Sequence, residues 1–188
     1  LEGGVLREEY RSFIGPHPLP IRYGLTVGEL AGMVNDERQL GCKLRVIPCE
    51  GWRRTQMFPD FGGTWVKPSG AISDFETALL YPGMCLFEGT NLSEGRGTGQ
   101  TFRLVGAPFV DGQRLSGEMN ALGLPGVAFL PAEFTPISSK FKDRRCEGVR
   151  IQVTDRFSFR SVLTGVCLLR RIQELWPEQV TFCQSPFS

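Results

Sequence analysis

The stretch MCLFEGTNLSEGRGTG, residues 84–99, carries two carboxylates, an arginine, an amide, several hydroxyls and four glycines directly after a short apolar run. The apolar run, Met84–Phe87, predicts a buried strand. The glycines that follow permit backbone conformations that most residues resist. Polar groups on a loop at the end of a strand are a common way to build a binding site. A packed core needs none of these groups, so we expect the loop after Phe87 to bind a ligand.

The chain before this loop predicts one well-marked helix. Residues 15–24 contain three prolines and predict an extended entry segment. Thr26 predicts an N-cap, and Glu29 three residues later completes a capping box. Apolar residues at helical spacing then predict a helix over 27–38. A strand is expected over 44–48, and a long irregular region rich in aromatic side chains over 50–83.

After the loop, strands and helices are predicted in turn. A strand at 84–89 leads into the loop, and the later elements are an extended segment at Phe102–Val105, a helix at 111–122, strands at 127–130 and 149–154, and a helix at 162–175. Strands interleaved with helices indicate an α/β fold, with α+β as the alternative. We expect a mixed sheet flanked by helices in a single domain.

Composition excludes several classes of function. A chain of 188 residues that is 41% hydrophobic and 22% charged is long enough for one domain with a real core. A net charge of +1 implies no general attraction to nucleic acid or to an anionic membrane. No apolar run approaches the roughly 20 residues of a membrane-spanning helix. One basic cluster consists of Lys140, Lys142, Arg144 and Arg145. Because an aspartate interrupts it, the cluster favours a solvated loop over a polyanion site.

The N-terminus and the cysteines add two expectations. The first residues do not resemble a signal peptide and include no initiator Met, so we expect a piece of a longer protein. The six cysteines form no C-x-x-C pair and His17 is the one histidine, so no metal site is expected. No cofactor is expected either. Cys85 and Cys167 are interpreted as small buried hydrophobic residues, and a disulfide between Cys42 and Cys49 stays open.

Several common catalytic motifs are missing. Gln100 stands where a G-x-G-x-x-G loop needs its last glycine, and no G-x-x-x-x-G-K-[ST] motif follows. No G-x-S-x-G motif is present, and a serine triad would have to recruit His17. Nucleotide binding and serine hydrolase chemistry therefore have little support.

Carbohydrate chemistry suits the loop better. Glycosidases need a proton donor at the leaving oxygen and a second group, commonly Asp or Glu, that stabilises or attacks the anomeric centre. Aromatic faces stack on sugar rings, and a guanidinium holds a carboxylate in bidentate fashion. The alternative is a structural loop in which Glu88 or Glu94 only neutralises Arg96.

Six sequence runs resemble, in the same order, those of a known family. They are YGLTVGELA at 23–31, GWRR at 51–54, YPG at 81–83, EGTNLSEGRGT at 88–98, GAP at 106–108 and FTP at 134–136. The chain therefore resembles the NamZ-type exo-β-N-acetylmuramidases over nearly its whole length. The long glycine-rich run is specific enough to make chance an improbable source of the similarity.

The resemblance implies a two-part enzyme, with an N-terminal Rossmann-like domain, a C-terminal domain and the sugar bound between them. This chain is similar to the second part, which implies an entry segment over 1–24 and the C-terminal domain over 25–188. The implied activity is release of N-acetylmuramic acid from the non-reducing ends of peptidoglycan fragments. The implied partners are MurNAc-GlcNAc fragments and the missing N-terminal domain, which would carry the family's EHG motif. The implied location is periplasmic or extracellular.

The isolated chain is expected to be inactive, and a non-catalytic carbohydrate-binding module or pseudoenzyme fragment is the alternative. Glu88 and Glu94 are the candidate catalytic residues that the resemblance implies. We expect Arg96 to pair with the lactyl carboxylate of the sugar or to orient Glu88. For Glu94 the alternative is a solvent-facing loop charge, and for Trp65 it is core packing. The candidate substrate-binding residues are Asn91, Ser93, Arg96, Thr98, Trp65 and Ser69.

Overall fold

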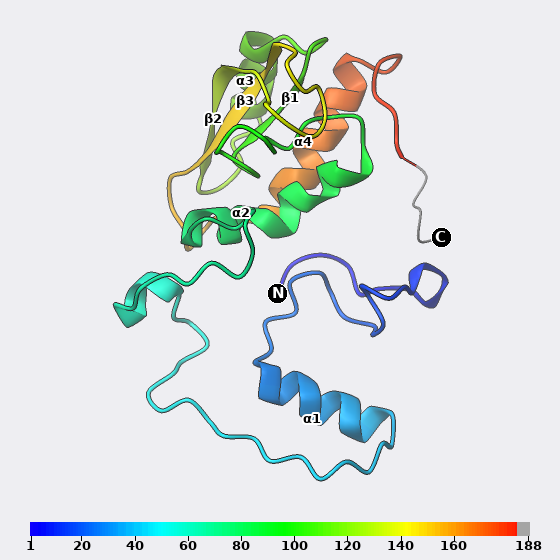
Figure 1. Ribbon diagram of the computed structural model, residues 1–188, viewed down its shortest axis with the longest axis vertical. Coiled ribbons are helices and arrows are strands. Elements are labelled where there is room, and N and C mark those ends of the chain that lie inside the picture. Colours follow the sequence, from blue (N-terminus) through cyan, green and yellow to red (C-terminus); the bar gives the residue numbers. More distant parts are fainter. Residues whose placement is uncertain (184–188) are drawn as a thin grey trace.

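The computed structural model describes residues 1–183, and its helices and strands occupy mainly the second half of the chain (Figure 1). Four α-helices are formed: α1 (Val27–Glu37), α2 (Phe75–Met84), α3 (Gly112–Ala121) and α4 (Ser161–Leu175). The strands are β1 (Leu104–Ala107), β2 (Val127–Phe134) and β3 (Cys146–Val153). Short 3-10 helices are η1 (Glu8–Tyr10), η2 (Phe58–Phe61) and η3 (Cys85–Gly89).

The three strands form one sheet in the order β1-β3-β2. Both pairings are antiparallel, with Val105 opposite Val149 and Phe129 opposite Ile151. These four side chains belong to the buried core, and α3 packs on β2 and β3. The expected class, helices combined with a sheet, is confirmed. Because the pairings are antiparallel rather than mixed, the arrangement is that of the α+β alternative.

Helices α2 and α4 pack in direct backbone contact beside the sheet. A Cβ atom added at Gly83 would lie 1.9 Å from the carbonyl oxygen of Ser161, so only glycine fits there. The hydroxyl of Ser161 accepts a hydrogen bond from the N–H of Gly83 (2.9 Å) and donates one to the carbonyl of Leu80 (2.8 Å). This contact fixes α2, and therefore the start of the glycine-rich loop, against the core.

Most of the expected elements are confirmed. The helix predicted over 27–38 is α1, and Thr26 and Glu29 form the predicted capping box. The helices predicted at 111–122 and 162–175 are α3 and α4. The two predicted strands at 127–130 and 149–154 are present, and both are longer than expected.

Two predicted strands are wrong. Residues 84–89 are helical, since Met84 ends α2 and η3 follows. Asp74 starts this helical segment, because its side chain accepts a hydrogen bond from the N–H of Thr77 (2.8 Å). A short buried apolar run does not by itself distinguish a strand from a helix. Residues 44–48 form no strand either, and Ile47 is 81% exposed there.

The first 71 residues contain no buried residue, and α1 lies apart from the sheet in Figure 1. Two polar side-chain contacts connect this part to α4 and to the turn before it. The carboxylate of Glu2 accepts a hydrogen bond from the N–H of Val162 at the start of α4 (2.9 Å), and Asp60 pairs with Arg156 (2.6 Å). Within residues 1–183, no helix combines the length and apolar character required to span a membrane.

Candidate functional site

The glycine-rich loop, residues 88–99, runs from η3 toward β1. Backbone hydrogen bonds join the loop to β1. The N–H of Ser93 donates to the carbonyl of Gly106 (2.8 Å), and the N–H of Gly106 donates back (3.1 Å). The N–H of Phe102 donates to the carbonyl of Glu94 (2.7 Å). The loop is therefore held in one conformation beside the sheet.

Glu94 is a buried carboxylate between two cations. Its side chain is 2% exposed, with Oε1 3.0 Å from Nε of Arg96 and Oε2 3.0 Å from Nζ of Lys140. An uncompensated charge at such a position would be strongly destabilising. Glu94 is thus not a solvent-facing loop charge, and both of its oxygens are already engaged.

Lys140 fastens the loop from a distant part of the chain. Besides Glu94, its ammonium group donates to the carbonyls of Phe87 (2.8 Å) and Leu92 (2.9 Å). The sequence placed Lys140 in a solvated basic loop, and this is wrong for Lys140, whose side chain is 25% exposed. No local pattern signals the contact, because Lys140 and Glu94 lie 46 positions apart.

Arg96 is held on three sides. Its Nη2 donates to Oε1 of Glu88, its Nε pairs with Glu94, and its guanidinium lies 5.3 Å from the centre of the Phe102 ring. The hydrogen bond that Arg96 donates to Glu88 raises the pKa of Arg96 above its ordinary value. The side chains of Glu88 and Arg96 are each 39% exposed, so this pair reaches the surface. The result is a fixed cation at the surface.

A cavity of about 320 Å³, which we call the Arg96 hollow, lies beside this pair. Arg96, Tyr81, Phe102 and Ser69 are among its lining residues. The Tyr81 ring meets the Phe102 ring edge to face, with ring centres 4.9 Å apart. Burial raises the pKa of Tyr81, and the charges of Cys85 and Glu88 act in the same direction. A cation, a phenol and a serine hydroxyl around one cavity can bind an anionic, hydroxylated ligand.

Tyr81 is not among the site residues predicted from the sequence, although it lies in the YPG run at 81–83. Trp65, which is among them, packs against the core and meets Phe58 edge to face (4.9 Å). Its indole N–H donates to the carbonyl of Ile72 (3.4 Å), and Trp65 does not line the Arg96 hollow. The structure therefore matches the core-packing alternative for Trp65.

Two further candidate residues lie in the scaffold of the loop. The amide of Asn91 donates to the carbonyl of Gln179 (2.7 Å) and accepts from the N–H of Thr181 (2.9 Å). Ser93 is 1% exposed, and its hydroxyl accepts from the N–H of Gly95 (3.2 Å). Both side chains hold neighbouring backbone in place rather than lining the Arg96 hollow.

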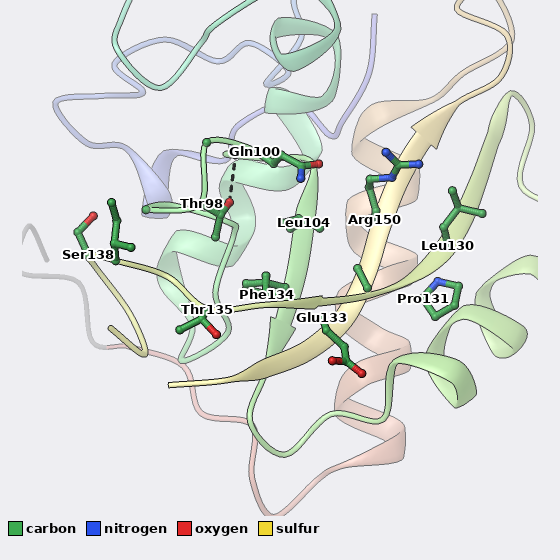
Figure 2. Close-up of a pocket in the computed structure, with 14 residues that line it drawn as sticks. Thr98, Gln100, Leu104, Leu130, Pro131, Glu133, Phe134, Thr135, Ser138 and Arg150 are labelled. Carbon is green, nitrogen blue, oxygen red and sulfur yellow. Dashed lines mark hydrogen bonds between the residues drawn. The ribbon is translucent and has the colours of Figure 1, made fainter. Parts of the chain in front are cut away.

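Thr98 lies on the other side of the loop from Arg96. Its hydroxyl donates to the carbonyl of Gly95 (2.6 Å) and accepts from the N–H of Gln100 (3.1 Å). Thr98 lines a second cavity, over the sheet, which Figure 2 shows. The structure thus pairs Arg96 with Glu88 and Glu94 and places Ser69 with Arg96 around the Arg96 hollow, while Thr98 lines the other cavity. The two glutamates are not among the residues that line the Arg96 hollow.

The metal-ligating and thiol groups of the described residues do not cluster in the way that Glu88, Glu94 and Arg96 do. In residues 1–183, no three of the His, Cys, Asp and Glu side chains are grouped so as to hold a metal ion. All six cysteines are free thiols, including Cys42 and Cys49. Burial, together with the charge of Glu88, raises the pKa of Cys85 to about 11.

Two family models match the chain. The description of the first is exo-beta-N-acetylmuramidase NamZ, C-terminal, and it matches residues 79–188. The second, described as the N-terminal part of the same enzyme, matches residues 1–76. This division differs from the one expected from the sequence, because residues 25–76 fall in the N-terminal match. The part of the chain without buried residues coincides closely with that match.

The chain is also similar to a named NamZ protein and to two solved structures. The peptidoglycan beta-N-acetylmuramidase NamZ of Bacillus subtilis (strain 168) is 42% identical over 182 residues, which are 97% of this chain and 44% of that protein. A solved DUF1343 family protein from Bacteroides fragilis NCTC 9343 has a TM-score of 0.89 at 30% identity, over 95% of this chain and 47% of that one. A second from the same organism has a TM-score of 0.63 at 33% identity, over 80% and 39%. The chain spans less than half the length of each of these relatives.

Proposed function

Because this chain belongs to the exo-beta-N-acetylmuramidase NamZ family, we propose that it forms the sugar-binding side of a glycoside hydrolase active on peptidoglycan. The proposed reaction releases N-acetylmuramic acid from the non-reducing ends of peptidoglycan fragments. The name of the Bacillus subtilis relative supports the substrate class. The chain spans 44% of that relative, so the proposal concerns what these residues contribute to the reaction.

The observation that carries the proposal is the position of Arg96. N-acetylmuramic acid differs from N-acetylglucosamine by a lactyl group that ends in a carboxylate. Arg96 lines the Arg96 hollow, and its Nη1 has no hydrogen-bond partner among residues 1–183, while Nη2 and Nε are engaged. A guanidinium fixed by two carboxylates and an aromatic ring is ready to bind an incoming carboxylate without further ordering. We assign Arg96 to the lactyl carboxylate.

The two glutamates have different roles in this proposal. One oxygen of Glu88 pairs with Arg96, while its Oε2 has no partner in the described chain, and the side chain reaches the surface. Glu88 can therefore face a substrate and is our candidate for the second carboxylate of the site. Both oxygens of Glu94 are occupied by Arg96 and Lys140. Glu94 thus positions Arg96 and does not contact the sugar.

The remaining wall of the hollow suits a sugar ring. The phenol of Tyr81 and the hydroxyl of Ser69 line the cavity that Arg96 lines, and both can exchange hydrogen bonds with ring substituents. Asn91 and Ser93 belong to the scaffold that holds the loop, because backbone groups engage their side chains.

A second candidate function is a carbohydrate-binding module without catalytic activity. It is favoured by the pairing of both loop carboxylates with cations, since Glu88 binds Arg96 and Glu94 binds Arg96 and Lys140. An oxygen held by a cation is not free to protonate a glycosidic oxygen. Both functions require the same bound sugar, and they differ in whether Glu88 takes part in turnover.

Titration of the chain with N-acetylmuramic acid and with N-acetylglucosamine, followed by NMR, tests the proposal. We expect N-acetylmuramic acid to shift the backbone amide signals of Arg96 and Phe102 and to bind about tenfold more tightly than N-acetylglucosamine, because only it carries the carboxylate. Equal affinities, or shifts confined to residues far from Arg96, would reject the assignment.

A further inference from the structure

The second cavity, which we call the sheet hollow, has no role in the function proposed above. Its volume is about 750 Å³, larger than that of the Arg96 hollow. It lies over the face of the sheet opposite the main core, and Thr98, Gln100 and Arg150 are among the residues drawn around it in Figure 2.

The floor of the sheet hollow is one row of the sheet. Leu104 of β1 and Leu130 of β2 are both paired with Arg150 of β3, so an arginine stands between two leucines. The next row on this face consists of small residues, Gly106, Gly148 and Ala132. A Cβ atom added at Gly148 would lie 2.0 Å from the carbonyl oxygen of Val105, so larger residues do not fit there. Of this row, Ala132 lines the sheet hollow beside Arg150.

Arg150 has no ion-pair or hydrogen-bond partner for its guanidinium within the described part of the chain. The acidic residue of the same cavity, Glu133, is paired with Arg145 (2.7 Å), and in Figure 2 it points away from Arg150. The hollow therefore contains a cation that no acidic side chain of the described chain neutralises. An anionic ligand complements that charge.

The walls supply further polar groups. The side chains of Gln100, Thr135 and Ser138 line the hollow, and none of them is hydrogen-bonded to another described residue. An amide, two hydroxyls and a guanidinium over an apolar floor can bind a hydroxylated ring that carries a carboxylate. β2 is an edge strand, but Pro131 removes a backbone donor from it, which disfavours addition of a peptide strand.

The glycine-rich loop is the wall between the two hollows. Arg96 lines one hollow, and its neighbour Gly97 lines the other. Gly97 is pressed against residues 137–138, because its carbonyl accepts from the N–H of Ile137 (3.0 Å) and an added Cβ would lie 2.6 Å from the carbonyl oxygen of Ser138. Adjacent residues of one fixed loop therefore line the two cavities.

We propose that the sheet hollow is a second saccharide subsite, in which Arg150 binds the carboxylate of a muramic acid unit further along the glycan. This inference depends on the proposed function, since the first unit occupies the Arg96 hollow. A glycan with a lactyl carboxylate on every second sugar presents two anions to two separate arginines, Arg96 and Arg150.

Calorimetric titration of the 188-residue chain with MurNAc-GlcNAc disaccharide and with the tetrasaccharide of two such units tests the subsite. We expect the tetrasaccharide to bind about tenfold more tightly than the disaccharide. Arg150→Gln should remove this advantage and leave disaccharide affinity within about twofold of the wild type. Arg96→Gln should weaken both ligands. Gln152→Ala, an exposed position on the same strand face, is the matched control and should change neither affinity.

The outcomes separate the two hypotheses. Normal disaccharide binding with no gain for the tetrasaccharide overturns the subsite and leaves the proposed function in place. A gain that survives Arg150→Gln overturns the role of Arg150. Absence of disaccharide binding overturns the proposed function and the subsite with it. Binding of an acidic tripeptide that requires Arg150, without any effect of glycan length, overturns the saccharide assignment in favour of a peptide.

Discussion

Nζ of Lys140 lies 3.0 Å from Oε2 of Glu94, and this contact joins the glycine-rich loop to a segment 46 positions later in the chain. The same ammonium group reaches the carbonyls of Phe87, Glu88 and Leu92. One lysine thus neutralises a buried carboxylate and satisfies backbone groups at the end of η3. Arg96 depends on this arrangement, because the other oxygen of Glu94 holds its Nε.

Lys140→Met should be strongly destabilising, because it leaves Glu94 with one cation and three carbonyls without their donor. We expect the free energy of unfolding to fall by about 3 kcal/mol, measured by urea denaturation. Lys142→Met is the matched control, since Lys142 is 63% exposed, and its effect should stay within about 0.5 kcal/mol. Equal effects of the two substitutions would show that the contact does not stabilise the fold.

Gly83→Ala should also destabilise the protein, because the added methyl group would meet the backbone of Ser161 at 1.9 Å and push α2 from α4. The expected loss is at least about 2 kcal/mol in the same assay. Gly117→Ala in α3 is the control, since a Cβ there meets no atom within 4 Å. Because alanine favours helix, Gly117→Ala should stabilise by about 0.5–1 kcal/mol. A mild effect at Gly83 would mean that the two helices do not pack in contact.

The N-cap residue of α2, Asp74, should make the stability of the protein depend on pH. Burial raises the pKa of Asp74, but hydrogen bonds from the Thr77 N–H, Ser73, the Thr77 hydroxyl and Arg103 outweigh it and lower the pKa from 3.8 to about 2. A carboxyl whose pKa is lowered on folding contributes stability above its unfolded pKa, and the contribution is lost as pH falls through the folded value. The wild type should therefore exceed Asp74→Ala in Tm at pH 5, and the difference should shrink between about pH 4 and about pH 2.

A Tm difference that stays constant from pH 5 to pH 2 would contradict this assignment for Asp74. Asp155→Ala is the comparison variant. The Asp155 carboxylate accepts hydrogen bonds from the Ser158 hydroxyl and the Phe157 N–H, but it does not cap α2, the helix that leads into the glycine-rich loop.

Glu88→Gln should slow turnover in the enzyme proposed above, assayed with this chain joined to a complete N-terminal domain of the family. If Glu88 is the second carboxylate of the site, turnover of a chromogenic muramic acid glycoside should fall at least about tenfold. The same variant should keep its Tm, because Glu88 is partly exposed and Arg96 retains Glu94. Near-normal rates would reject a catalytic part for Glu88 and favour the binding-module function.

Local signals predicted the parts of the fold that depend on neighbouring residues. The capping box of Thr26 and Glu29 and the Asp111 N-cap lie within one turn of the helices they begin, so α1 and α3 were placed to within about two residues. The strand predicted at 84–89 is wrong because a short apolar run is equally compatible with a buried strand and with a buried helix end. Asp74, ten residues earlier, decides between the two by starting α2.

The candidate site was predictable only in part. The density of polar groups in residues 88–99 predicted a site that includes Glu88, Glu94 and Arg96, and the structure brings these three residues together. The contacts that separate their roles are long-range: Lys140 covers Glu94, and Gln179 and Thr181 engage Asn91. Such pairings leave no periodic pattern in the sequence, so Asn91 could not be told apart from a sugar ligand.

The most direct test of the account is the preference of the chain for N-acetylmuramic acid over N-acetylglucosamine, measured by calorimetry for the wild type and for Arg96→Gln. We predict a preference of about tenfold in the wild type and none in the variant, with N-acetylglucosamine affinity unchanged. The variant should also have a lower Tm, because Glu94 then keeps Lys140 as its one cation partner in the described chain. A variant that keeps the full preference would contradict the assignment of Arg96 to the lactyl carboxylate.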